Sequence, residues 1–397
     1  MTELKTSKRL LSLDVYRGIT IAGMILVNNP GSWGNIYTPL GHAEWNGLTP
    51  TDLVFPFFVL IMGISMYISY SKFNFAFSTN TFIKLLRRSS LIFLIGLFLH
   101  WCSLFLRGYH NLSANEELSF FQVIGQAAWN FENIRILGVL PRLAIIAFCG
   151  SMIILLVNHK FIPWIIGITL ILYWVIIGLT DSYMPSEDNI VAVIDRLIIG
   201  TNHMYTDHFS DGTKLKLDPE GLFSTIPAIA HVLIGFLIGK IVMQNPDRNE
   251  AIRKIMIAGA LLLFAGFLMN YGFPINKKIW TSSFVLVTCG FGSLLFGVLI
   301  WIIDVKGKRG WIITFFNSFG VNPMFIYILA FFLSVLTAYI GFTYNGEWIA
   351  FKTFFYRHII ESIFSGKLAS LVFAILFVSA NWVVGHILYK KKIYIKL

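Results

Sequence analysis

The chain has 397 residues, of which 56% are hydrophobic and 13% are charged, and its mean hydropathy is +0.72. An average soluble domain is about 25% charged, so this composition excludes an ordinary soluble enzyme, a disordered chain and a coiled coil. The net charge of +11 does not indicate a nucleic-acid partner, because membrane proteins concentrate Lys and Arg in cytoplasmic loops. The composition predicts one polytopic membrane domain, 1–397, surrounded by lipid.

Ten runs of about 20 apolar residues predict an all-α transmembrane bundle of about ten spans. The runs are Leu10–Asn28, Leu53–Tyr70, Leu91–Leu106, Ile136–Val157, Phe161–Leu179, Leu222–Met243, Ile255–Tyr271, Ser282–Ile303, Trp311–Ile340 and Leu368–Tyr389. The ninth run is long and holds Pro323, so it is a kinked span or two short ones, and eleven is the alternative count. Phe351–Phe364 is a candidate interfacial or re-entrant segment.

The orientation follows from the basic residues between the runs. With the N-terminus inside, 19 Lys and Arg lie in cytoplasmic segments and 10 in outer segments. This bias predicts that both termini are cytoplasmic and that the segments 29–52, 107–135 and 180–221 lie outside.

The three cysteines give no sign of a disulfide framework or a metal site. Cys102, Cys149 and Cys289 lie in or beside apolar runs, and no two of them have CxxC spacing. The sequence also lacks a P-loop and the GxGxxG, HExxH and GxSxG motifs, so soluble-type nucleotide or metal chemistry has no support. We expect isolated buried thiols and no bound metal.

The segment after the first run holds the densest polar and aromatic cluster of the chain. It combines His42 with Glu44, Asp52 and the tryptophans Trp33 and Trp45. Such a loop can supply a general base, an orienting carboxylate and stacking surfaces. The alternative is a solvated turn with interfacial tryptophans.

Ionisable residues inside apolar runs mark a second candidate region. Asp14 and Arg17 are three residues apart in the first run, so they share a helix face and can pair. Such a pair is either functional or a structural pair that fixes the register of the helix. Arg17, near the inner surface, could bind a phosphate. Arg142, inside the fourth run, must face a partner or a cavity.

Carboxylates also gather just before the sixth run, with Asp218 and Glu220 at its start and Asp207 and Asp211 further upstream. They could attract a cationic substrate. The alternative is the preference of helix N-termini for negative charge.

Six segments resemble the heparan-alpha-glucosaminide N-acetyltransferase family, and the likeness extends from near residue 10 to beyond 320. The segments are Ser12–Gly18 (SLDVYRG), Leu26–Asn29 (LVNN), His42–Phe58 (HAEWNGLTPTDLVFPFF), Arg135–Leu143 (RILGVLPRL), Ile194–Arg196 (IDR) and Asp218–Thr225 (DPEGLFST). The block from His42 to Phe58 is the specific one, whereas an Asp-x-x-Arg-Gly motif also occurs in other membrane acyltransferases.

The resemblance implies a polytopic enzyme that takes acetyl-CoA from the cytosol and acetylates a terminal amino sugar on the far side of the membrane. The catalytic His of the family falls on His42, and the Asn that assists it falls on Asn28. Pro141 stands where relatives often have Gln, which leaves the lining of the donor path open. Bacterial relatives imply a location in the bacterial inner membrane.

The sequence and the resemblance together assign three groups of site residues. The catalytic group is His42, Asn28 and Asp52; the CoA-binding group is Arg17, Asp14 and Arg142; the acceptor-binding group is Trp45, Glu44 and Glu220. Asp52 or Glu44 would orient the imidazole, and His42 would act either as general base or as a covalent acetyl carrier. The open alternatives are O-acetylation of an envelope glycan, a secondary transporter and a non-catalytic scaffold, and a homodimer is also open.

Overall fold

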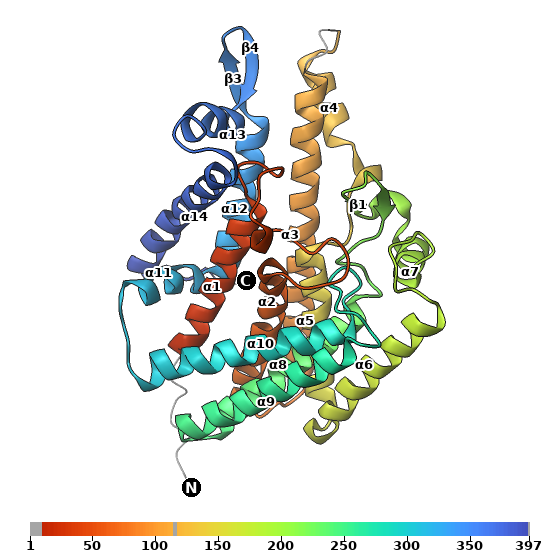
Figure 1. The fold of residues 1–397 in the computed structure, drawn as a ribbon, viewed down its shortest axis with the longest axis vertical. Coiled ribbons are helices and arrows are strands. Elements are labelled where there is room, and N and C mark those ends of the chain that lie inside the picture. The colour runs from red at the N-terminus through yellow and green to blue at the C-terminus, as the bar shows by residue number, and fades with distance from the viewer. Residues whose placement is uncertain (1–9, 114–116, 396–397) are drawn as a thin grey trace.

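The computed structural model describes residues 10–113 and 117–395, which form a helical bundle, as the composition predicts (Figure 1). Its helices are α1 (Leu11–Asn28), α2 (Val54–Tyr70), α3 (Thr79–Leu112), α4 (Phe120–Ala128), α5 (Val139–Leu156), α6 (Ile162–Leu179), α7 (Ile190–Ile199), α8 (Thr225–Gln244), α9 (Arg248–Met269), α10 (Ser282–Leu299), α11 (Trp311–Gly320), α12 (Pro323–Tyr339), α13 (Phe351–Phe354) and α14 (Gly366–Lys390). Two antiparallel hairpins join β1 (Thr206–His208) to β2 (Lys214–Lys216) and β3 (Gly341–Tyr344) to β4 (Glu347–Ala350).

Nine helices of the described residues are long and apolar enough to cross a membrane, and α11 with α12 makes a tenth span if the bent pair counts as one. These helices identify an integral membrane protein and confirm the predicted count of about ten. The ninth predicted run is broken, because α11 and α12 meet at 83°. Pro323 begins α12 and has no N–H to continue the hydrogen bonds of α11, so the chain turns there.

The third span is much longer than the apolar run predicted. α3 has 34 residues, roughly 51 Å at 1.5 Å per residue, and so it exceeds the thickness of a bilayer core. Its first three turns carry Lys84, Arg87 and Arg88, whose charge led the hydropathy analysis to assign a loop, although their helix propensity is high. In Figure 1, α3 stands upright and reaches beyond most of the bundle, with α4 beside its upper end.

Central and peripheral helices differ in how much of their surface other helices cover. In α8, 67% of the residues of its apolar window are buried, against 17% in α9 and 28% in α6 and α14. α8 packs against α2, α5 and α6, so its apolar surface meets protein, whereas most of the α9 surface is left for lipid.

The segments predicted as outer loops contain structure of their own. The segment 29–53 holds two 3₁₀ turns, and the segment 180–221 holds α7 and the β1–β2 hairpin, which the sequence did not predict. Segment 351–364, the candidate interfacial segment, contains α13 and a π-helical turn, Phe355–Ile360. We call the surface formed by segments 29–53, 180–224 and 270–281 the loop face. The opposite face carries the start of α1 and the loop 306–310.

α1 and α11 cross with their backbones in contact. A Cβ added at Gly18 would lie 1.7 Å from the carbonyl oxygen of Phe316, and one added at Gly320 would lie 1.8 Å from that of Asp14. Only glycine fits at both positions. Since α12 begins three residues after Gly320, this crossing fixes where the first turn of α12 lies.

Candidate active site on the loop face

Asp52 locks the loop that carries His42. Its Oδ2 accepts hydrogen bonds from the backbone N–H groups of Ala43 and Thr49, both at 3.1 Å, and from the Thr49 hydroxyl at 3.0 Å. Its Oδ1 lies 2.6 Å from Nδ1 of His42. The carboxylate is 1% exposed while the imidazole is 45% exposed, so a fixed buried acid orients a base that stays accessible.

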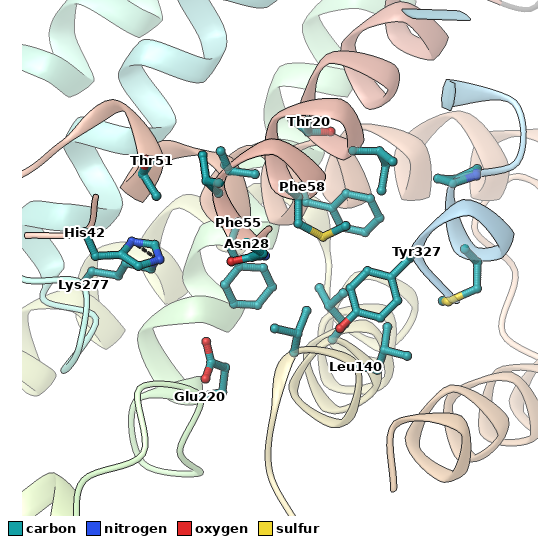
Figure 2. Close-up of a pocket in the computed structure, with 18 residues that line it drawn as sticks. Thr20, Asn28, His42, Thr51, Phe55, Phe58, Leu140, Glu220, Lys277 and Tyr327 are labelled. Carbon is teal, nitrogen blue, oxygen red and sulfur yellow. Dashed lines mark hydrogen bonds between the residues drawn. The ribbon is translucent and has the colours of Figure 1, made fainter. Parts of the chain in front are cut away.

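His42 lies at one end of a cavity that continues between α1, α2, α5 and α12 (Figure 2). The cavity holds about 820 Å³ of space free of protein atoms, part of it open to solvent. Polar groups line its loop-face end, and Figure 2 shows Asn28 lying between the His42–Lys277 pair on one side and Tyr327 on the other, with Glu220 below. Apolar side chains from the four helices make up most of the remaining wall.

Of the predicted catalytic residues, the structure brings His42, Asn28 and Asp52 together at this end of the cavity. Asn28 is the last residue of α1, and Asp52 belongs to the 3₁₀ turn that leads into α2. Asp52 contacts His42 directly, whereas Glu44, the other candidate for orienting the imidazole, points elsewhere: its Oε1 accepts hydrogen bonds from the backbone and hydroxyl of Ser210.

Glu220 is the acceptor-site residue that the structure places in the cavity wall. Arg135 holds it in a network, because the guanidinium donates to Glu220 and also to both carboxylate oxygens of Asp218. Burial raises the pKa of Glu220, but the charges of Arg135, Arg142 and Lys277 outweigh that effect and hold the pKa below its ordinary value. These charges favour the ionised form of Glu220, and its side chain faces the same space as His42.

Trp45 and Glu44 do not line this cavity in the structure. Trp45 is buried, and its indole N–H donates to the carbonyl of Tyr183 at 2.7 Å, so it ties the His42 loop to the segment after α6. The acidic side chains upstream of α8 are also engaged, since Asp207 pairs with Lys278 and Asp218 with Arg135. Their charge is largely neutralised by these partners.

Arg142 is fully buried at the loop-face end of α5, far along the bundle from the start of α1. Its Nη atoms donate to the carbonyls of Pro219 and Ser224, the second at 2.7 Å, and its guanidinium lies 4.1 Å from the ring centroid of Trp280. These contacts tie Arg142 to the turn that presents Glu220.

Asp14 and Arg17 form the predicted pair on one face of α1, with 2.9 Å between Nη1 and Oδ1. Arg17 also donates to the hydroxyl of Ser65 on α2, and its side chain is 25% exposed. It lies one turn from Thr20, which lines the inner part of the cavity and donates to the Arg17 carbonyl. Neither arginine lines the cavity: Arg17 lies near Thr20 at its inner part, and Arg142 lies behind the turn of Glu220 at its loop-face end.

Lys277 is a site residue that the sequence reading missed. Its Nζ lies 3.0 Å from Nδ1 of His42 and 3.4 Å from Oδ1 of Asp52. Burial lowers the pKa of Lys277, although Asp52 and Glu220 favour the ammonium. One signal was available: Lys277 and Lys278 lie in a short loop assigned to the outer side, where the charge bias disfavours lysine.

Among residues 10–113 and 117–395, no three His, Cys, Asp or Glu side chains are grouped so that they could hold a metal ion. The three cysteines are free thiols, with Cys289 buried. The cavity wall includes the imidazole of His42, the carboxylate of Glu220, the amide of Asn28 and the amine of Lys277.

Two curated relatives of this chain carry the same protein name. No protein-family model matches the chain. It is 27% identical over 446 residues to the heparan-alpha-glucosaminide N-acetyltransferase of Mus musculus, covering 100% of this chain and 62% of that protein. It is 28% identical over 372 residues to the protein of the same name from Homo sapiens, covering 81% of this chain and 52% of that protein. The chain thus spans between half and two thirds of the length of these curated relatives.

The match to the mouse protein covers the whole chain, so it includes the segments that form the cavity and the loop face. The similarities confirm the resemblance that the sequence indicates: the chain is similar to heparan-alpha-glucosaminide N-acetyltransferases, over its whole length for the mouse protein and over 81% of its length for the human protein.

Proposed function

We propose that this protein is a transmembrane acetyltransferase that moves an acetyl group from acetyl-CoA to the amino group of a sugar at the loop face. The observation that carries the proposal is the buried Asp52 held against Nδ1 of His42, with the imidazole opening into a cavity that runs between helices. The similarity to two named N-acetyltransferases supports the reaction type. The name of those relatives gives heparan-alpha-glucosaminide as the acceptor, and an amino sugar is the acceptor class that we propose here.

The chemistry requires a base, because only a neutral amine can attack a thioester. In the proposed reaction, Nε2 of His42 takes a proton from the amine as its nitrogen attacks the acetyl carbonyl carbon. The C–S bond then breaks, and the thiolate of CoA leaves with a proton returned by His42. The amide of Asn28 would donate to the oxyanion that forms on the carbonyl. A variant route, in which His42 first carries the acetyl group, uses the same residues.

We propose that acetyl-CoA, the acetyl donor, enters from the face opposite the loop face and binds in the apolar part of the cavity. Walls of aliphatic and aromatic side chains suit the uncharged arm of CoA, and Thr20 offers a hydroxyl within them. We propose that Arg17, oriented by Asp14, meets a phosphate of CoA that enters from the cytoplasm. Arg142 is proposed as a support for the turn that carries Glu220, because its donors bond to backbone carbonyls.

Glu220 is proposed to bind the ammonium form of the acceptor before deprotonation. Replacing Glu220 by Gln keeps the shape and removes the charge, so KM for glucosamine should rise roughly 10-fold, with a smaller change in kcat. Initial rates with labelled acetyl-CoA measure both constants. Glu44→Gln is the matched control, because Glu44 bonds to Ser210 away from the cavity. A KM for glucosamine in Glu220→Gln equal to that of the parent would remove Glu220 from the acceptor site.

The proposal also fixes an orientation, with the loop face outside and both termini in the cytoplasm. Thr38 is exposed on the loop face and Lys308 is exposed on the opposite face. In a variant without the three native cysteines, Thr38→Cys should react with an impermeant thiol reagent added to intact cells. Lys308→Cys should react only after the cells are opened. The reverse pattern would place the active site in the cytoplasm.

Purified protein in detergent, with labelled acetyl-CoA and a panel of glucosamine, glucose and amino-glycan ends, tests the function directly. We expect acetyl transfer to glucosamine and release of free CoA. Faster acetylation of glucose would favour the O-acetyltransferase. Absence of both transfer and CoA binding would favour a secondary transporter.

A further inference from the structure

Two charged groups meet at one atom of His42, one from the same loop and one from a distant part of the chain. Nδ1 lies 2.6 Å from the Asp52 carboxylate and 3.0 Å from the Lys277 ammonium. The lysine and the carboxylate are themselves 3.4 Å apart. The Asp52 contact belongs to the His–Asp pair already described, and the Lys277 contact has no assigned role.

A neutral imidazole cannot satisfy both neighbours through Nδ1. If Nδ1 carries the proton, it donates a hydrogen bond to Asp52. The Lys277 ammonium then donates its hydrogen bonds to Asp52 and to other acceptors. If Nδ1 lacks the proton, it accepts from Lys277, and its lone pair then faces the carboxylate at 2.6 Å. The short contact to the carboxylate favours the first form, in which the lone pair of Nε2 is free to act as a base.

The Lys277 charge adds a second effect, which concerns the doubly protonated imidazolium. A positive group about 3 Å from the ring opposes a second positive charge, whereas Asp52 alone would favour it. The other charged groups that face this cluster are Glu220 on the turn before α8 and Arg142 on α5, and they carry opposite signs. Lys277 is therefore the cation nearest to the imidazole among the described residues.

The turn that carries Lys277 is built to hold it there. Asn276 is 1% exposed, and its backbone N–H and carbonyl bond to the side chain and N–H of Thr281. Its amide donates to Asn46 at 3.1 Å, and Gly47 N–H donates to Ile275, so the turn is joined to the loop that carries His42. The next residue, Lys278, points to Asp207 instead. The fold thus aims one of two adjacent lysines at the imidazole.

We propose that Lys277 is a positioning residue that keeps the His42 imidazole neutral. In this form the Nδ1–H group of His42 donates a hydrogen bond to Asp52, and the lone pair of Nε2 points toward the cavity. This inference rests on the proposed function for its use in catalysis. The protonation state of His42 can be measured in a protein that has no transferase activity.

Two variants remove the charge, Lys277→Met and Lys277→Gln, and Lys278→Met is the matched control at the neighbouring position. Diethyl pyrocarbonate modifies neutral imidazole, so the extent of modification of His42 against pH, read by mass spectrometry, reports its protonation. In both Lys277 variants we expect the midpoint of this profile to move about one pH unit higher, because the opposing charge is gone. Lys278→Met should keep the midpoint of the parent, and His208 in the same digest serves as an internal reference.

The rate of acetyl transfer gives the second readout. In Lys277→Met the rising limb of kcat against pH should move in the same direction, with KM for acetyl-CoA unchanged. Lys277→Arg, which keeps the charge, should retain the limb of the parent. A His42 profile in Lys277→Met and Lys277→Gln that matches the parent overturns the inference. A shifted modification profile in a protein without any transfer activity would instead contradict the proposed function and leave the inference standing.

Discussion

Replacing His42 by alanine is expected to reduce acetyl transfer about 10²- to 10⁴-fold, while the protein still folds and binds CoA. The imidazole is 45% exposed at the end of the cavity, so its loss removes the base without opening a buried core. Loss of a covalent carrier would cost more than the loss of a base. Initial rates at saturating labelled acetyl-CoA measure the effect, and size-exclusion chromatography checks the fold.

Two variants calibrate that result. Asn28→Ala should have the milder effect, roughly 10²- to 10³-fold, if the amide donates to the oxyanion. His208→Ala removes an exposed imidazole of the β1–β2 hairpin and should leave the rate unchanged. A His42→Ala protein with a turnover near that of the parent would remove the central claim of the proposed mechanism.

The second large effect is expected on folding, at the crossing of α1 and α11. Gly320→Ala would place a methyl group 1.8 Å from the carbonyl oxygen of Asp14, where backbone rather than a flexible side chain must move. Overpacking of this kind costs typically about 1–3 kcal/mol, and a clash with backbone lies at the upper end. We expect the midpoint of thermal unfolding in detergent to fall by roughly 3 °C. Transfer activity should fall too, because the first turn of α12 lines the cavity.

Gly167→Ala is the matched control for this prediction. Gly167 also lies inside an apolar helix, α6, but nothing lies within 4 Å of the position that a Cβ would take. The same chemical change should therefore leave the midpoint unchanged or raise it slightly, since alanine has the higher helix propensity. Equal midpoints for the two variants would mean that the crossing tolerates separation of the helices.

Hydropathy predicted the membrane spans from sequence, because a bilayer requires about 20 apolar residues per helix wherever that helix packs. It failed where the helix and the apolar stretch have different lengths. The polar turns at the start of α3 lie beyond the apolar run, and the break between α11 and α12 lies inside one. The hairpins of the loop segments were not predicted, because strands of three or four residues carry too little alternation to be recognised.

The sequence also determined the candidates His42, Asn28 and Asp52, since they lie within 25 residues and carry the motif of the resemblance. Only the tertiary structure decided the rest of the site. Lys277 comes from a turn 235 residues away along the chain from His42, and its adjacent lysine points elsewhere, so no local pattern separates the two. Glu220 enters the cavity because Arg135 and Arg142 hold its turn, whereas the equally acidic Glu44 points to Ser210. Side-chain direction depends on contacts between distant segments, and composition and spacing do not encode those contacts in any single stretch of sequence.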